Sequence, residues 1–379
     1  MATQSPKPPI NKGLEGLVVA DTQLSEVDGE HGRLIYHGYE IADLAQNATF
    51  EDVAYLLWMG QLPTASELQD LNKRMAANRL LPDGVLDILK SLPTSTVPMD
   101  VLRTGASALG AVKKIDGKAT LEDAIALTAA FPTIVAAFQR MREGKAPIAP
   151  RADLSHAANY LYMLTGSAPS EQKTRALDTY LVLTADHGLN ASTFTARVIA
   201  STEADMCSSV VGAIGALKGP LHGGAPQLVL DMLKAIGTAE NAETWIRNAL
   251  NRHEKLMGFG HRVYKTEDPR ARVLRKLADQ LTEVEFFKLA STVEDTALRL
   301  LHELKPERRI YTNVEFWSAA VMHAVGLPDD LFTPTFGCSR VAGWTAHVLE
   351  QQSDNRLIRP ASEYVGPWNL KVAPIGQRT

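Results

Sequence analysis

Three short stretches of the chain combine glycine, histidine and charge in a way that a buried core does not require. In the first, GPLHGGAP, glycines lie on both sides of His222 and would let a ligand approach the backbone. Pro226 suits the start of the next helix, so we expect His222 just ahead of a helix N-terminus, whose positive end disfavours imidazolium. A neutral imidazole held there can donate a hydrogen bond to a carbonyl that is becoming an enolate. A glycine-rich turn with an incidental histidine explains the same spacing equally well.

The second stretch, MGFGHRVYKTEDPRARVLRKL, gathers positive charge in an otherwise acidic chain. Asp268 followed by Pro269 predicts a helix start, with an N-cap and a proline at the first helical position. Arg270 would then lie in the first turn, where a cation is disfavoured by roughly 0.3–1 kcal/mol, and a bound carboxylate would offset this. A solvated basic helix face is the alternative, although it needs no glycines such as Gly258 and Gly260. The clustered basic residues are His261, Arg262, Lys265, Arg270 and Arg272.

The third stretch, IYTNVEFWSAAVMHAVG, sets Glu315 among apolar residues. Val314, Phe316 and Trp317 would desolvate this carboxylate and raise its pKa toward a value useful for a general base. A lone glutamate on an exposed helix edge is the alternative. Farther along the chain, three arginines could bind a carboxylate, although most arginines lie at the surface: Arg340, Arg356 and Arg359.

Composition and charge narrow the classes of function. A length of 379 residues predicts two domains, or one large domain with an insertion, and 45% apolar residues with 22% charged ones are typical of a globular protein. The net charge of −4 provides no general basic field for nucleic acid or an anionic membrane, so local cations must hold any anionic ligand. Cys207 and Cys338 form no disulfide framework. We therefore expect a soluble cytoplasmic protein.

Common cofactor and nucleophile motifs are missing from the sequence. GASALG misses the G-x-S-x-G spacing by one residue, and GFGHRV has Val263 where a dinucleotide motif needs its third glycine. The ten histidines include no H-E-x-x-H and no tight cluster with cysteine, so we expect no metal and no bound cofactor. The longest apolar stretch, from Ala124 to Phe138, falls short of the about 18 residues that a membrane span needs.

The elements that must position these residues are mostly helices. Short alternating runs between Leu14 and Gly38 predict two or three strands, and apolar residues then recur at helical spacing along most of the chain. ATFEDVAYLLWMGQL is an example, with Thr49 near its start. We expect a large, mainly α-helical, all-α protein with a few N-terminal strands. The proline-rich residues 1–13 are expected to form a disordered leader.

Several motifs, taken in their order along the chain, resemble the citrate synthase family: GPLHGGA, GFGHRVYK with DPRA, NVEFWS, SRVAGW and the terminal RP. The stretches LSHAANYLYM and ADHGLNASTFTAR resemble the same family. The 2-methylcitrate synthase relatives share nearly all of them. The resemblance extends from about Leu14 to Gly366. It implies a homodimer with two domains per subunit. The small domain, residues 225–329, would be inserted in a large domain made of residues 14–224 and 330–379, and would close over substrate.

The resemblance also implies a role for each matched residue. His222 would hydrogen-bond the thioester oxygen of acetyl-CoA, His261 would polarise the ketone of oxaloacetate, and Glu315 would be the catalytic base. Substrate-binding positions are matched by His187, Arg270, Arg340 and Arg359, of which Arg359 is expected to reach across from the partner subunit. Coenzyme A positions are matched by Leu256, Met257, Gly258, Phe259, Gly260 and Lys265.

The implied reaction condenses acetyl-CoA with oxaloacetate and water to citrate and coenzyme A. A carboxylate removes a proton from the acetyl methyl group while a neutral imidazole stabilises the enolate oxygen. The enol attacks the ketone, and water then hydrolyses the citryl thioester. The thioester is a substrate, and no metal or redox cofactor is required. Domain closure is expected to exclude water until the carbon–carbon bond has formed.

The sequence departs from the family pattern at several positions. The family base is usually aspartate, so the extra methylene of Glu315 must be absorbed by the local backbone, because misplacement by about 1 Å can cost on the order of a hundredfold in rate. Thr184 stands where many members have histidine, which puts a secondary substrate contact in doubt. Thr312 replaces the proline of a Tyr-Pro-Asn motif.

Two other functions stay open at this point. A preference for propionyl-CoA would make the chain a 2-methylcitrate synthase, and one methylene in an acyl pocket discriminates by only about 1–3 kcal/mol. From a different class, glutamate at position 315 could mark a non-catalytic relative that binds oxaloacetate or coenzyme A as a sensor. The matched histidines and arginines argue against the sensor.

Overall fold

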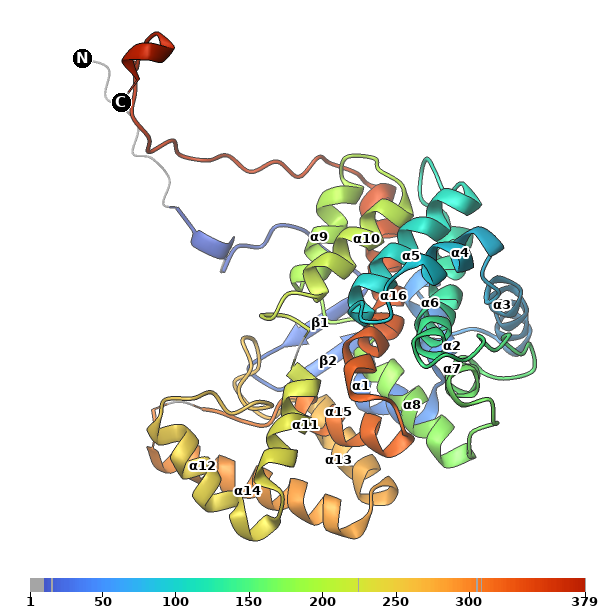
Figure 1. Ribbon diagram of the computed structural model, residues 1–379, viewed down its shortest axis with the longest axis vertical. Helices are drawn as coiled ribbons and strands as arrows, with labels where there is room; N and C mark the ends of the chain where they lie inside the picture. Colours follow the sequence, from blue (N-terminus) through green and yellow to red (C-terminus); the bar gives the residue numbers. More distant parts are fainter. Residues whose placement is uncertain (1–9, 15, 224, 305, 308, 379) are drawn as a thin grey trace.

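The computed structural model describes residues 10–378 except 15, 224, 305 and 308 (Figure 1). Within this part of the chain there are sixteen α-helices and one small sheet, which confirms the mainly α fold. Most of the predicted leader, residues 1–9, lies outside the described residues. The helices are α1 (Ile41–Asn47), α2 (Phe50–Met59), α3 (Ala65–Asn78), α4 (Asp83–Ser91), α5 (Pro98–Lys113), α6 (Leu121–Arg142), α7 (His156–Thr165), α8 (Glu171–Thr184), α9 (Ala191–Ala200), α10 (Met206–Leu217), α11 (Ala225–Ile236), α12 (Ala242–Asn251), α13 (Pro269–Leu281), α14 (Val284–Leu304), α15 (Val314–Val325) and α16 (Phe332–Ser353).

Three short antiparallel strands form the sheet, in the order β1 (Ser25–Asp28), β2 (Arg33–Tyr36) and β3 (Tyr39–Glu40). The predicted number of strands is right, but they begin at Ser25 rather than near Leu14. Tyr36 is fully buried, and its hydroxyl donates to the carbonyl of Asp186 at 2.7 Å. The sheet is thereby attached to the segment that precedes His187.

Local capping signals place the helices that carry the candidate residues. Asp268 accepts the backbone N–H of Arg270 and caps α13, with Pro269 at the first helical position, as predicted. Pro226 is the second residue of α11, so the turn that holds His222 does precede a helix. Asn313 caps α15 by accepting the N–H of Glu315 at 3.0 Å. Polar caps thus fix the starts of both helices that reach the candidate site.

Helix α6 is the central apolar helix of the fold. It is long and apolar enough to cross a membrane by length and composition, but 83% of its most apolar 18-residue window is buried inside the protein. Phe131 and Ile134 on α6 are fully buried, as is Trp344 on α16, and α6 and α16 pack against each other. This burial is typical of the core helix of a globular domain.

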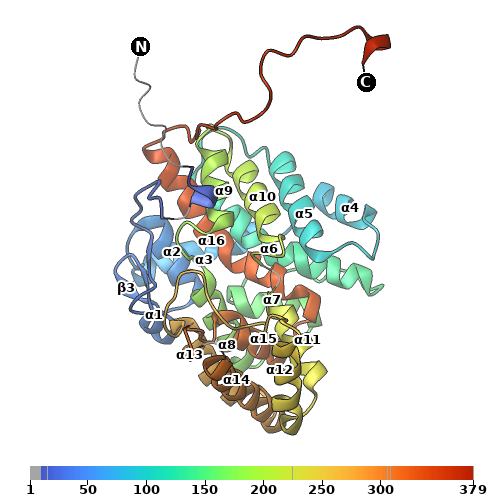
Figure 2. The same cartoon turned by 90° about the vertical axis from the view of Figure 1, so that its left-hand side faces the viewer.

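The helices gather in two groups. Figures 1 and 2 show α11–α15 together at one end of the molecule and α3–α6 with α9 and α10 toward the other, while the sheet lies between them. After α16 the chain leaves the body as an extended tail, on which Val365, Trp368 and Val372 are 88%, 72% and 89% exposed. Several candidate residues belong to the first group or directly precede it: His222 lies just before α11, Arg270 on α13 and Glu315 on α15.

Candidate active site

His222 is held through one ring nitrogen by the start of α9. The backbone N–H of Ser192 donates to Nε2 at 3.3 Å, and the Ser192 hydroxyl lies 2.8 Å from the same nitrogen. Because Nε2 accepts, the proton of the neutral ring is assigned to Nδ1. Trp344 donates from Nε1 to the Ser192 hydroxyl at 3.0 Å, and both residues are fully buried. The ring therefore keeps one orientation, with Nδ1–H as its free donor.

Burial is the main reason that this imidazole stays neutral. Burial and, to a lesser extent, the Arg340 guanidinium lower the pKa of His222 to about 4. The position of His222 ahead of a helix N-terminus also predicts a neutral ring. The main cause is instead desolvation by the surrounding protein.

His261 is held through the opposite ring nitrogen. Its Nδ1 accepts the backbone N–H groups of Val263 and Tyr264, both at 3.0 Å, so the neutral ring carries its proton on Nε2. Burial lowers the pKa of His261 to about 4, with a further lowering by Arg270 that Asp268 opposes. At neutral pH this imidazole is an uncharged donor through Nε2.

His187 lies beside Tyr264 and His261. The Tyr264 hydroxyl lies 3.2 Å from Nε2 of His187, and the His187 and His261 rings are 5.4 Å apart between centroids. Burial, followed by Arg270 and His261, lowers the pKa of His187 well below its ordinary value. Tyr264 is only 3% exposed, and its ring also lies 4.7 Å from that of His261. His187 is therefore a third neutral imidazole at pH 7, and it lies beside His261.

Arg270 is buried and paired within its own helix start. Its Nε and Nη2 donate to the two carboxylate oxygens of Asp268 at 3.0 and 2.8 Å. The N-cap residue Asp268 thus offsets the unfavourable position of the Arg270 cation in the first turn. A bound carboxylate is therefore not needed to stabilise the cation there. The fork uses one proton each of Nε and Nη2, which leaves Nη1 and the second proton of Nη2 as donors for a substrate.

Arg340 is 1% exposed and is positioned by the end of α8. Its Nε donates to the carbonyl of Thr184 at 2.7 Å, and its guanidinium carbon lies 4.5 Å from the centre of the Phe336 ring. The Thr184 hydroxyl donates within the core, to Tyr180 or Ser339. Thr184, which departs from the family pattern, therefore serves here as a backbone support for an arginine.

Glu315 occupies the first turn of α15 and keeps part of its side chain accessible. Burial raises its pKa to about 7, as the apolar neighbours predicted. Arg270 and Arg340 oppose this rise, while Asp268 adds to it. Arg340 affects the pKa of both Glu315 and His222, so both residues lie within electrostatic range of this guanidinium. Arg270 affects His187, His261 and Glu315, and Arg340 also affects His187, so these two arginines connect the four residues electrostatically into one cluster.

Two glycines predicted to bind coenzyme A are required by the fold itself. Gly258 and Gly260 have φ of +85° and +82°, and a Cβ at Gly258 would stand 2.8 Å from the Cβ of Phe316. The Asn313 amide donates to the Gly260 carbonyl at 2.8 Å, and the Gly260 N–H donates to the Tyr311 carbonyl at 2.8 Å. The loop is therefore fastened to the start of α15, where Glu315 lies.

The other residues matched to coenzyme A differ in exposure. Leu256 is 7% exposed and belongs to the core, so only its backbone could meet a ligand. Met257 is partly buried, Phe259 packs 5.2 Å from the Phe316 ring, and Lys265 is exposed. Of this set, Lys265 is the residue that offers a charged group to solvent.

Arg359 does not join the cluster of its own chain. It is exposed on the tail, and its neighbour Ile358 donates a backbone hydrogen bond to Ser201, just past the C-terminal end of α9. His222 is bound by Ser192 at the other end of that helix. Nine helical residues separate the two ends by about 13 Å. The tail therefore starts away from the cluster.

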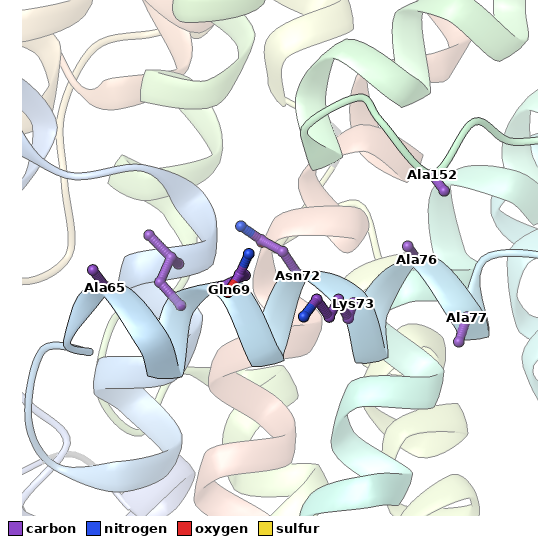
Figure 3. Close-up of a pocket in the computed structure, with 8 residues that line it drawn as sticks. Ala65, Gln69, Asn72, Lys73, Ala76, Ala77 and Ala152 are labelled. Carbon is purple, nitrogen blue, oxygen red and sulfur yellow. The ribbon is translucent and has the colours of Figure 1, made fainter.

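Sequence reasoning missed Ser192, Trp344 and Tyr264 as parts of the site. Two signals were available: the N-cap Asn190 placed Ser192 at a helix start, and Trp344 closes the quoted motif SRVAGW. No local pattern brings Tyr264 to His187, since the two are 77 residues apart. A surface hollow of about 600 Å³ lies along one face of α3 opposite Ala152, and no residue of the cluster lines it (Figure 3).

Comparison with known proteins gives a consistent result. The family model described as "Citrate synthase, C-terminal domain" matches residues 13–361. The citrate synthase of Haloferax volcanii is 44% identical over 97% of this chain and 99% of its own length, and the 2-methylcitrate synthase of Shewanella oneidensis is 41% identical over 97% of each. The citrate synthase of Thermoplasma acidophilum, solved as a ternary complex with carboxymethyl coenzyme A and oxaloacetate, superposes with a TM-score of 0.91 at 32% identity, covering 98% of this chain and all of that one.

Proposed function

The chain belongs to the citrate synthase family, and we propose that it joins the methyl carbon of acetyl-CoA to the ketone carbon of oxaloacetate, releasing citrate and coenzyme A. It is an enzyme of the acyltransferase class that converts the acyl group into an alkyl group on transfer. The observation that carries the proposal is that two neutral imidazoles are held through opposite ring nitrogens, His222 through Nε2 and His261 through Nδ1, while burial raises the pKa of the Glu315 carboxylate.

In the first step Glu315 removes a proton from the acetyl methyl group. A carboxylate whose pKa is near 7 is a stronger base than an ordinary glutamate and is still substantially ionised at neutral pH. The Nδ1–H of His222 donates to the thioester oxygen as negative charge develops there. A neutral donor can match the proton affinity of this oxygen without transferring a full charge.

In the second step the new enol carbon bonds to the ketone carbon of oxaloacetate. The ketone oxygen gains negative charge and takes a proton that His261 donates from Nε2. Arg270 through Nη1 and Arg340 through its two terminal nitrogens bind the carboxylates of oxaloacetate, for which planar guanidinium donors are well suited. Water then adds to the thioester carbonyl and returns a proton to His261, the carbon–sulfur bond breaks, and the thiolate takes the proton held by Glu315 and leaves as a free thiol. We propose that no metal or redox cofactor takes part.

Thiol release is the direct test. The wild-type chain mixed with acetyl-CoA and oxaloacetate is expected to release free coenzyme A and citrate in equal amounts, and to release no thiol with either substrate alone. A purified, folded chain that binds oxaloacetate but releases no thiol with either acetyl- or propionyl-CoA would overturn the proposal and favour a sensor.

Use of propionyl-CoA is the second candidate, because 2-methylcitrate synthases are nearly as similar to this chain as citrate synthases. An acyl pocket distinguishes one methylene by only about 1–3 kcal/mol. The ratio of kcat/KM for the two thioesters, measured at saturating oxaloacetate, decides between them. A ratio above about ten in favour of acetyl-CoA supports citrate synthase.

We further propose a homodimer in which the partner subunit supplies Arg359. The exposed apolar tail that carries Arg359 in this chain supports a second copy as its binding surface, because Trp368 and Val372 are otherwise left in water. We also propose that residues 225–329 form a small domain that closes over substrate, and that the enzyme is cytoplasmic. Two free, buried cysteines fit a reducing compartment.

A further inference from the structure

The turn between β1 and β2 packs against the loop that carries His261, although more than 230 residues of sequence separate them. The Lys265 N–H donates to the Gly29 carbonyl at 2.8 Å. Figure 1 shows the loop that follows α12 running beside β1 and β2. We propose that this turn, residues 28–32, is a positioning element for His261, and that Gly29 is its central residue. The assignment of a catalytic effect rests on the proposed function, whereas the packing does not.

Gly29 is required because of what lies against it. A Cβ at this position would stand 2.8 Å from the carbonyl carbon of Val263 and closer still to its oxygen, so a methyl group there forces the loop to move. The φ of Gly29 lies outside the left-handed region, so alanine can adopt the backbone conformation of this turn. The glycine is thus explained by close approach and not by turn geometry.

The neighbouring Gly32 provides a second close contact with the same loop. A Cβ there would stand 2.6 Å from Cγ2 of Thr266 and 2.9 Å from the carbonyl oxygen of Glu267. Two glycines of one turn therefore face two successive parts of one loop. This repeated fit argues that the turn and the loop are shaped for each other.

The backbone of Val263 connects this contact to His261. Its N–H donates to Nδ1 of His261 at 3.0 Å, while its C=O is the group packed against Gly29. The next N–H, that of Tyr264, donates to the same ring nitrogen at 3.0 Å. A shift of Val263 therefore disturbs the hydrogen bonds that keep the proton of His261 on Nε2.

The turn is itself rigid and anchored on the opposite side of the site. Asp28 accepts the N–H groups of Glu30 and His31 at 3.1 and 3.0 Å, which is an internal brace of the turn. The Ser25 hydroxyl at the start of β1 donates to Asp186, which directly precedes His187. The hairpin therefore links the backbone near His187 to the loop of His261, and so fixes the distance between two imidazoles of the site.

The test compares Gly29→Ala with two control substitutions, one that shortens an exposed side chain of the same turn and one that adds a Cβ on a distant helix. Glu30→Ala changes an exposed side chain of the same turn, and Gly84→Ala adds a Cβ on α4 at ordinary contact distance, 3.4 Å from Val112. We expect Gly29→Ala to lower kcat/KM for oxaloacetate by about ten- to a hundredfold, since a loop displaced by about 1 Å loses near-attack geometry. Both controls should stay within about twofold of wild type.

Amide hydrogen exchange separates this proposal from the proposed function. In the chain without substrates, Gly29→Ala should speed exchange at Val263, Tyr264 and Lys265 while the core of α6 stays protected. Wild-type exchange at these amides together with wild-type kcat/KM would overturn the proposal. If wild type releases no thiol, the proposed function fails, and the exchange comparison still decides the packing.

A second variant tests the proposal if Gly29→Ala does not fold. Asp28→Ala removes the internal brace of the turn without adding an atom, so it should move exchange and kcat/KM in the same direction by several-fold. An Asp28→Ala chain that matches wild type in both measurements would also contradict the proposal.

Discussion

The carboxylate of Asp268 accepts the backbone N–H of Val314 at 3.1 Å, and this hydrogen bond joins the starts of α13 and α15. The same carboxylate forms the buried fork with Arg270. One acidic side chain therefore joins Arg270, which we propose binds substrate, to the helix that carries Glu315. The relationship explains why the two residues reach the same site from helices that are separated by α14.

We predict that Asp268→Asn weakens both folding and oxaloacetate binding. Loss of the charge leaves Arg270 buried without a counterion, which should lower the free energy of unfolding by about 2–4 kcal/mol. Urea unfolding and the Kd for oxaloacetate measure the two effects. Glu267→Gln is the matched control, because its ion pair with Arg272 is exposed and should contribute less than about 1 kcal/mol. Equal effects of the two substitutions would contradict the assignment.

Glu315 is expected to be the base, and its length is expected to matter. Glu315→Gln should lower kcat by on the order of 10²–10⁴-fold while oxaloacetate still binds, because the amide cannot take the proton. Glu315→Asp withdraws the carboxylate by about 1 Å and should cost about ten- to a hundredfold. Thiol release gives both rates. Near-normal turnover of Glu315→Gln would exclude this residue as the base.

The pKa of Glu315 predicts how activity and stability depend on pH. Activity should rise with pH through about 7 as the carboxylate form appears. The residual activity of Glu315→Gln should lack this dependence on pH. Because the folded state raises this pKa above its ordinary 4.5, folding binds a proton between about pH 4.5 and 7, and the wild type loses stability as pH rises across that window. Glu315→Gln should therefore be more stable than wild type at pH 8 but not at pH 4. Urea unfolding at the two pH values is the measurement.

Ser192 is expected to orient His222 rather than to contact substrate. Ser192→Ala removes the hydroxyl that Trp344 binds and leaves one weak backbone hydrogen bond to Nε2. We expect kcat with acetyl-CoA to fall about ten- to a hundredfold while oxaloacetate affinity is retained. Ser208→Ala, at an exposed helix start, is the control. A fall in oxaloacetate affinity of similar size would point to general loosening of the site instead.

The features of this site that could be predicted from the sequence are those whose physical cause lies within a few residues of the group concerned. The N-cap Asp268 with Pro269 and the desolvating neighbours of Glu315 are all within a few residues of the group that they affect. The pairing of Arg270 with Asp268 is equally local, but the helix dipole alone predicts a bound carboxylate at Arg270 and not this pairing.

The rest depends on tertiary contacts that no window of sequence contains. Ser192 lies 30 residues from His222, Tyr264 lies 77 from His187, and Thr184 lies 156 from Arg340. The pKa of His222 was predicted in the right direction for the wrong main reason, because burial can be judged only after the fold brings the surrounding protein around the ring. Resemblance located the residues, whereas the structure was needed to explain what holds them.

The tail makes a prediction about subunits that can be tested without a structure of the dimer. Arg359→Ala and Glu315→Gln should each be nearly inactive alone. When the two are unfolded together and refolded as a mixture, random pairing makes half of the dimers hybrid. If Arg359 acts in the partner's site, each hybrid contains one complete site, and activity should recover to about a quarter of wild type. If Arg359 acts within its own chain, every site in the mixture lacks one of the two residues, and no activity should return. Refolded wild type under the same conditions is the control.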